Sequence, residues 1–473
     1  MIQVKKIGLL MMLSVMLLIS ACSGNGGNDS PSAPGGDWGG VGQSAPGGDS
    51  DGDPKGDPKG VKEGGKKTVV VSVLRKDRFL ETAVRMFEEK HKDIHIEIEE
   101  YKASEGTGQS GMAMEAADLE KYVQSMTTQV ISGKGSDLIL MNNLPQNKFV
   151  ANNLLVNLYD LMAQDSSFDQ NALYANILKA SQDGDGLYVM PLSFSLETVQ
   201  GNTELLKKAN ISVDKNKPWS WSQFKDVAMK LKEQGDREGY YNLIMSPLLY
   251  DYIEDNYAEL VGQGQPNFDS DLFRNMMKEI KSIYDEGLLG EGFTSDAGTA
   301  VFQMVGIFNP AAALTMPSNF EYYQKPSASG KQEGVPFKSM YSLGVNSKSD
   351  VQPEAWEFIK FLLSDEMQAS PDLFGLPMNK GATDKKLNEI LQQIENGTLD
   401  LPIPKDMLPD GETTKKRITE VQKLISEAGV RKSSDMKVLT IALEEFESFK
   451  SGQKSAEEVS KLIQNRVTTY LNE

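Results

Sequence analysis

Apolar and polar residues follow two different periods along the chain. Residues 68–74 and 137–141 are continuous apolar runs rich in β-branched side chains, as in strands covered on both faces. Between 94 and 98, isoleucine alternates with polar residues, which predicts a third strand. Apolar residues recur at helical spacing through 79–90 and 119–130. The order strand, helix, strand, helix, strand predicts a mostly parallel sheet with right-handed crossovers.

Local start signals mark elements farther along the chain. Residues 187–191 predict a short strand closed by Pro191. Ser220 and Gln223 form a capping-box pattern at the start of a helix. A first-turn proline at 353 and a Ser–Glu cap at 455 and 458 predict two later helices. Two tryptophans lie on apolar helix faces, where we expect core packing: Trp221 and Trp356.

The N-terminus predicts export. Lys5 and Lys6 precede an apolar run at 7–19, which is too short to span a bilayer as a stable helix and is typical of a signal peptide. The only cysteine, Cys22, follows Ser20-Ala21 directly. We therefore expect a signal peptide at 1–21. Two fates are open for Cys22: it is lipidated, or the protein is secreted in the ordinary way and Cys22 is incidental.

Residues 23–65 have the composition of a tether. Gly, Pro and Ser fill 25 of these 43 positions. Such a segment cannot bury enough apolar surface to offset its backbone entropy, so we expect disorder through 22–67. Three aspartates between 49 and 53 have the spacing of a calcium loop, but Pro54 stands where that loop needs glycine.

Composition and charge exclude several classes of protein. The net charge of −18 and pI near 4.8 disfavour nucleic-acid binding. One cysteine and two histidines cannot supply a disulfide framework, a zinc cluster or haem ligands, so no cofactor or metal is expected. Gly133-Lys134 does not form a phosphate loop, because Val130 stands where a glycine is required and the surrounding order is helix, loop, strand.

Several short motifs stand in the order of a known family. They are a helix-to-strand step at 87–96, a Gly-x-Asp-hydrophobic strand at 132–140, a hinge proline at 191, a Leu-Leu-Lys-Lys-Ala-Asn-Ile segment at 205–211, a Trp-Ser-Trp-Ser-Gln-Phe helix start at 219–224, a late strand and helix at 343–361, and a closing helix from 454. Together they cover about 68–473, and this region resembles the extracellular solute-binding proteins of ABC importers, family 1, the group that includes maltose-binding protein. Ile19-Ser20-Ala21-Cys22 likewise resembles a lipoprotein lipobox, which implies acylation of Cys22.

This resemblance implies an α/β, two-lobed periplasmic-binding-protein-like fold with a hinge and a ligand cleft. The first lobe would comprise 68–190 plus 330–375, and the second 191–329 plus 376–473. A solute that contacts both lobes would favour the closed form. The chain would be a monomer that docks on membrane permease subunits.

Ligand-binding positions follow from the family resemblance and from the topology. Ligands sit beyond the carboxyl ends of the strands in such sheets. The loops after 68–74 and 137–141 lie there, and the family also uses the segment after the hinge proline and two later regions. The expected contacts are Arg75, Asp77, Asn142, Asn143, Ser193, Phe194, Ser195, Asn309 and Tyr341. Their side chains can form hydrogen bonds to a polyol or stack on a ring.

Several functions remain open at this stage. A sugar or oligosaccharide is the first expectation from the family, with an oligopeptide or another polar solute as alternatives. A sensor or adhesin could use the same fold without transport. A glycan-active enzyme is the least expected function. His91 and His95 have the i,i+4 spacing of a metal pair, but they straddle a helix end and a strand start and should not share one face; the 67 acidic residues leave a catalytic Glu/Asp pair open. The expected location is the extracytoplasmic face of a Gram-positive cell membrane, with the lipid as anchor.

Overall fold

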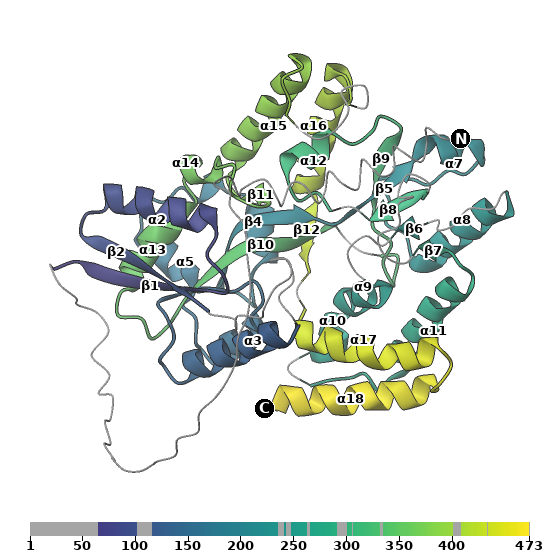
Figure 1. The fold of residues 1–473 in the computed structure, drawn as a ribbon, viewed down its shortest axis with the longest axis horizontal. Coiled ribbons are helices and arrows are strands. Elements are labelled where there is room, and N and C mark those ends of the chain that lie inside the picture. Colours follow the sequence, from purple (N-terminus) through teal and green to yellow (C-terminus); the bar gives the residue numbers. More distant parts are fainter. Residues whose placement is uncertain are drawn as a thin grey trace, which may run out of the picture.

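The computed structural model describes residues 65–101, 116–234, 241–242, 247–262, 265–290, 300–304, 306–331, 334–400, 408–432 and 434–472. The predicted signal peptide, Cys22 and the tether up to residue 64 lie outside the described residues. Figure 1 shows two sheets side by side, each covered by helices.

The larger sheet has seven strands in the order β11-β4-β10-β3-β1-β2, with β12 beside β10. Its strands are β1 (Lys67–Val73), β2 (Ile94–Glu100), β3 (Leu138–Leu140), β4 (Met190–Leu196), β10 (Val335–Val345), β11 (Leu376–Pro377) and β12 (Ala428–Arg431). β1 is parallel to β2 and β3, whereas β10 is antiparallel to β3 and β4. The three strands predicted at the start of the folded region are thus confirmed as β1, β2 and β3.

The smaller sheet has five strands in the order β7-β6-β8-β5-β9. They are β5 (Thr198–Asn202), β6 (Tyr241–Asn242), β7 (Leu289–Gly290), β8 (Phe302–Met304) and β9 (Phe320–Gln324). β5 pairs antiparallel with both β8 and β9.

Helices cover both sheets. They are α2 (Arg78–Lys90), α3 (Ala116–Ile131), α4 (Gln146–Ala151), α5 (Leu158–Gln164), α6 (Ala175–Ala180), α7 (Thr203–Lys208), α8 (Trp221–Glu233), α9 (Leu248–Asp255), α10 (Tyr257–Val261), α11 (Asp271–Asp285), α12 (Pro310–Leu314), α13 (Gln352–Leu362), α14 (Asp365–Gln368), α15 (Lys380–Glu395), α16 (Gly411–Ser426), α17 (Met436–Lys450) and α18 (Ala456–Asn472), with a short 3₁₀ turn at Gln170–Ala172. The predicted capping box of α8, the first-turn proline of α13 and the reciprocal Ser455–Glu458 bonds before α18 are all confirmed.

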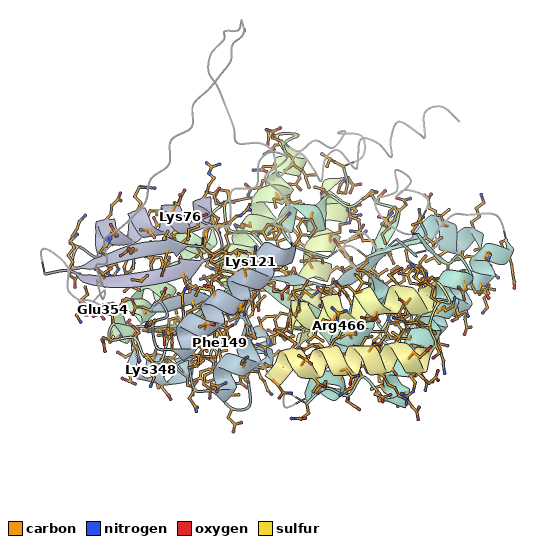
Figure 2. All side chains as sticks on the ribbon, turned by 60° about the horizontal axis from the view of Figure 1, so that its bottom comes forward. Lys76, Lys121, Phe149, Lys348, Glu354 and Arg466 are labelled. Carbon is orange, nitrogen blue, oxygen red and sulfur yellow. The ribbon has the colours of Figure 1, made fainter. Side chains whose placement is uncertain are left out.

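The larger sheet separates two apolar cores. One core contains α2, α5, α6 and α13 residues such as Phe79 and Trp356. The other lies under α3 and α4, where the labelled Phe149 is fully buried (Figure 2). The continuous apolar character of β1 and β3 follows from this arrangement, because strands covered on both faces have no solvent side.

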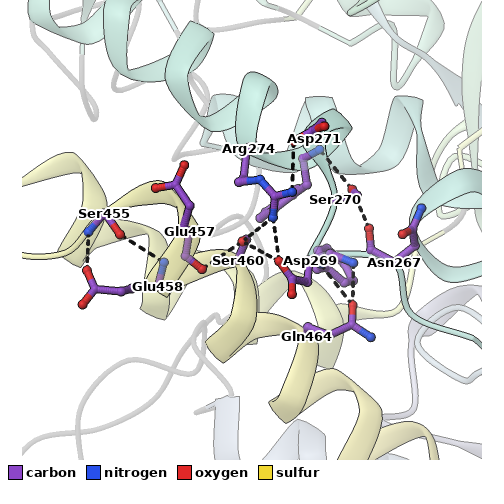
Figure 3. A network of polar contacts seen from close by, with 12 residues as sticks. Asn267, Asp269, Ser270, Asp271, Arg274, Ser455, Glu457, Glu458, Ser460 and Gln464 are labelled. Atoms are coloured by element: carbon purple, nitrogen blue, oxygen red, sulfur yellow. Dashed lines mark hydrogen bonds and ion pairs between the residues drawn. The ribbon is translucent and has the colours of Figure 1, made fainter.

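The smaller sheet shares a third core with α8, α9, α11, α17 and α18. Trp221 is fully buried there, as its apolar helix face predicts. α18 is tied to α11 by polar contacts, in which Arg274 donates to Asp269 at 2.6 Å and to Ser460 at 3.3 Å (Figure 3). Between α17 and α18, Arg466, labelled in Figure 2, pairs with Glu444 and Glu445.

β4 differs from the strand expected at 187–191. It begins at Met190 and continues to Leu196, so Pro191 is its second residue and does not end it. A proline is tolerated near the start of a strand, and the following residues pair with β10 on one side and β11 on the other. Local sequence rules could not reveal this pairing.

Among the described residues, three passages connect the part of the chain that carries one sheet to the part that carries the other: residue 197 after β4, residues 325–331 and 334 between β9 and β10, and residues 432 and 434–435 after β12. The first passage falls after β4 and not at 190, because all of β4 belongs to the larger sheet. β11 and β12 also belong to that sheet, although the ranges expected from the sequence put residues 376–473 in the second lobe.

Candidate functional site

Asp77 and Tyr341 meet at the carboxyl end of β1. Asp77 caps α2 by accepting a 2.8 Å hydrogen bond from the backbone N–H of Leu80. The phenol of Tyr341, on β10, is hydrogen-bonded to the same carboxylate, and burial followed by the charge of Asp77 raises the pKa of Tyr341 well above its ordinary value. The Tyr341 ring packs edge-on against Phe79, with centroids 5.5 Å apart. The phenol therefore stays protonated and donates to Asp77.

The loop after β3 is fastened to the same part of β10. Asn142 donates a 2.5 Å hydrogen bond to the carbonyl of Met340 and accepts a 3.1 Å bond from the N–H of Ser342. Asn142, its neighbour Asn143 and Arg75 in the β1–α2 loop are all exposed. The two loops that the topology predicts at one sheet edge are thus both connected to β10 around residue 341.

The predicted residues of β4 divide between its two faces, because successive side chains of a strand point to opposite sides. Ser193 donates a 2.6 Å hydrogen bond to the carbonyl of Phe374, and Ser195 contacts the sulfur of Met340 at 3.2 Å. Phe194 is fully buried and packs edge-on against Tyr174. Phe194 is therefore a packing residue in this structure and is not positioned to touch a solute.

Asn309 has a structural contact and an aromatic neighbour. It caps α12 by accepting a 2.7 Å hydrogen bond from the N–H of Ala312. Phe308, immediately before it, stacks on Phe374 with ring centroids 6.1 Å apart and an interplanar angle of 21°. Phe374 is 54% exposed, which is unusual for a phenylalanine and leaves much of its surface open to solvent.

Sequence reasoning missed the Phe308–Phe374 pair. Phe374 lies between α14 and β11, where no periodic pattern marks it. The adjacent Gly375 is the one local signal: its φ is +107°, and a Cβ atom there would lie 2.9 Å from the side chain of Ser193. The glycine lets the backbone approach β4 and holds Phe374 at the surface.

A cavity of about 410 Å³ lies between the parts of the chain that carry the two sheets. The larger-sheet part contributes α4, the turn at 183–186 and β12, and the smaller-sheet part contributes α9 and α10. The lining residues are Asn147, Asp183, Glu254, Asp255, Tyr257, Ala258, Val261, Gly262, Val430, Arg431 and Lys432. Among the described residues that line the cavity, none is a contact predicted from the sequence. The charged end of α9 carries no sequence motif that would mark it as a site.

A cluster of buried charges adjoins this cavity. Lys325 pairs with Asp251 at 2.5 Å and with Glu197 at 3.1 Å. Lys338 pairs with Glu197 at 3.1 Å and with Glu254 at 3.0 Å. Lys432 pairs with Asp255.

The carboxylates of this cluster respond differently to burial. Burial alone would raise the pKa of Glu197, but attraction from Lys325 and Lys338 outweighs it and lowers the pKa to about 2. For Asp251, burial outweighs the attraction of Lys325 and raises the pKa to about 7. Glu197 therefore stays ionised near neutral pH, whereas Asp251 is poised to take up a proton.

Three of these carboxylates have the spacing of a metal site. Oxygen atoms of Glu197, Asp251 and Glu254 lie within 4.8 Å of one another. The ammonium groups of Lys325 and Lys338 already pair with all three. The two lysines balance two of the three carboxylate charges, and a divalent cation would have to compete with them.

The family to which the chain belongs follows from a comparison with known families. The family model described as bacterial extracellular solute-binding protein matches residues 73–369, more than half of the chain. The chain belongs to this family. The resemblance noted in the sequence is thereby confirmed.

Solved structures show the same fold as this solute-binding protein. The sugar-binding protein MalE of Xanthomonas citri is 14% identical with a TM-score of 0.56, covering 86% of this chain and 98% of the other. Maltose-bound MalE3 of T. maritima is 16% identical with a TM-score of 0.52, covering 85% and 99%. An ABC substrate-binding protein of Listeria monocytogenes in complex with cycloalternan is 14% identical with a TM-score of 0.52, covering 86% and 98%.

These likenesses confirm the two-lobed α/β fold of the solute-binding protein. The cavity between the two lobes is one candidate contact surface, and the Phe308–Phe374 pair is a second. Within the described part of the chain, no helix combines the length and the apolar character needed to span a bilayer.

Proposed function

We propose that this chain is the substrate-binding lipoprotein of an ABC importer. It captures a sugar or oligosaccharide between its lobes and delivers it to membrane permease subunits. The cavity carries this proposal, because residues from both lobes line it, and a solute in it can therefore favour the closed form over the open one.

The chemistry of the interlobe region supports a polyhydroxylated solute. Carboxylates, an amide and a guanidinium line the cavity, and together they offer both acceptors and donors. The exposed ring of Phe374 offers a face on which the apolar side of a sugar could pack. The ligands named for relatives, maltose and cycloalternan, make sugars the first class to test.

A thermal-shift screen over maltose, larger oligosaccharides, peptides and polyamines tests the solute class. A ligand present at a hundred times its dissociation constant adds about 2.7 kcal/mol of stability. We propose Arg75, Asp77, Asn142, Asn143, Ser193, Ser195, Asn309 and Tyr341 as residues that form or support one wall of the site. Asn147→Ala, in the lining of the cavity, should reduce the shift, as should Asn142→Ala and Phe374→Ala, whereas Asn388→Ala, at an exposed position on α15, should not. If a peptide or polyamine but no sugar stabilises the protein, the sugar assignment is wrong.

We also propose that lipid on Cys22 anchors the chain at the extracytoplasmic face of a Gram-positive membrane, with 22–67 as tether. Two or more acyl chains give stable anchoring where one does not. Cys22→Ser should abolish incorporation of labelled palmitate and release the protein into the medium. Uptake of a labelled solute that requires this chain would distinguish an importer subunit from a sensor or adhesin, and retention of Cys22→Ser on membranes would contradict the anchor.

A further inference from the structure

The three passages described above each contribute a residue to one buried charge cluster. Glu197 lies in the first passage, Lys325 begins the second, and Lys432 begins the third. The side chains of Lys325 and Lys432 are only 1% and 2% exposed. The cluster is therefore located where the lobes would have to move relative to each other.

Two ion pairs in this cluster join the lobes directly. Lys338 of β10 and Lys432, after β12, come from the larger-sheet part. They pair with Glu254 and Asp255, two consecutive residues of α9, whose neighbours Tyr252 and Ile253 are buried in the core of the smaller-sheet part. Rotation of one lobe away from the other would separate both pairs.

Separating these pairs costs free energy because the carboxylates are buried. The side chains of Glu254 and Asp255 are each only 6% exposed. Removing the partner of a buried charge is strongly destabilising, because the remaining charge is left uncompensated. In an opening motion, water can enter and recover part of this cost, so the pairs bias the lobes toward contact.

The same two carboxylates line the interlobe cavity, together with Lys432. Asp255 uses Oδ1 to bind Lys432, and its buried Oδ2 has no hydrogen-bond partner within the described parts of the chain. A buried acceptor without a donor is unfavourable.

We propose that Glu254 and Asp255 are positioning residues that latch the two lobes together through Lys338 and Lys432. Where the cavity holds the solute of the proposed function, the latch links solute binding to closure, and in this respect the inference rests on that function. The bias toward closure itself is a property of the protein without solute. It can therefore be tested even if no solute has been identified.

The test measures the distance between the lobes without any added ligand. Spin labels are attached to Lys92→Cys and Gln453→Cys, which are exposed and lie on opposite lobes, in the full chain carrying Cys22→Ser. Glu254→Gln and Asp255→Asn keep the side-chain shape but remove the charge, and each should raise the open fraction about fivefold or more, as expected for a coupling of 1–3 kcal/mol. Glu259→Gln, on the exposed side of α10, is the matched control and should leave the distances unchanged.

Two further variants separate the latch from a general loss of stability. Lys338→Arg retains the charge and should keep distances near those of the wild type, whereas Lys338→Met should open the lobes. Adding Glu254→Gln to Lys338→Met should change the open fraction much less than the two single effects combined. Unchanged distances in Glu254→Gln and Asp255→Asn, or an equal shift in Glu259→Gln, would overturn the proposal. Absence of solute binding would count against the proposed function and leave the latch as it stands.

Discussion

The hydroxyl of Ser193 donates a 2.6 Å hydrogen bond to the carbonyl oxygen of Phe374, 181 residues away. This bond joins strand β4 to the segment that presents the exposed Phe374 ring. Ser193 is fully buried, so water does not reach its side chain. The position of an exposed aromatic ring thus depends on a hydroxyl in the interior.

Ser193→Ala should lower the free energy of unfolding by about 1 kcal/mol, because the Phe374 carbonyl loses its donor. Ser195→Ala is the matched control, since the partner of Ser195 is the sulfur of Met340, a weak acceptor. Urea unfolding of both variants measures the difference. A loss for Ser195→Ala equal to that for Ser193→Ala would contradict the role assigned to the carbonyl bond.

Arg417 connects α16 to the end of α12 through backbone carbonyls. Its guanidinium is buried and donates to the carbonyls of Leu314, Met316 and Pro317. Arg417→Met should therefore lower the free energy of unfolding by about 3 kcal/mol, since these acceptors lose charged donors. Arg85→Met removes an exposed i,i+4 pair with Glu89 and should change stability by less than about 0.5 kcal/mol. Similar unfolding midpoints for both variants would refute this account.

Local patterns predicted the elements whose environment is uniform along their length. β1 and β3 are covered on both faces, so their sequences are apolar runs. α2 buries one face, so its apolar residues recur at helical spacing. Both patterns can be recognised without knowledge of distant contacts. β4 was misplaced because Pro191 suggested an end. Its continuation depends on pairing with β10 and β11, which are more than 140 residues away.

The candidate site was predictable to the extent that topology determines it. Asp77 and Asn142 follow parallel strands and are both bonded to residues of β10, as the shared sheet edge requires. Glu254 could not be recognised, because its partner Lys338 is 84 positions away and only the packing of α9 beside β10 brings them together. Among the 67 acidic residues, no spacing distinguishes it.

Asp251 should make stability depend on pH in an unusual direction. Its carboxyl faces Lys325 and the acids Glu197 and Glu254, and its pKa rises from 3.8 to about 7 on folding. Between these values the folded state holds a proton that the unfolded state has lost. Stability therefore falls as pH rises through this window, by up to about 1.4 kcal/mol per pH unit.

Asp251→Asn should remove this contribution. Urea unfolding at pH 5, 6, 7 and 8 should show the variant gaining stability relative to the wild type as pH increases. Asp271→Asn, at an exposed position on α11, should parallel the wild type at every pH. A constant difference between Asp251→Asn and the wild type across this range would show that Asp251 does not titrate there.

Gly334 should be the least replaceable glycine of the passage from β9 to β10. Its φ is +88°, and a Cβ atom there would lie 2.8 Å from the carbonyl oxygen of Glu427. The same oxygen accepts a 2.8 Å hydrogen bond from the N–H of Val335, so the clash would disturb the pairing of β10 with the segment before β12. Both backbone conformation and contact therefore oppose a side chain at this position.

Gly334→Ala should lower the free energy of unfolding by about 3 kcal/mol, because αL strain and a backbone clash add together. Gly397→Ala is the matched comparison, with φ +65° and nothing within 4 Å of the added Cβ, so only the conformational cost of about 1 kcal/mol applies. Denaturant unfolding of the two variants separates the contact from the strain. Equal losses of unfolding free energy in the two variants would contradict this account. They would show that the Glu427 carbonyl moves aside without a measurable free-energy cost.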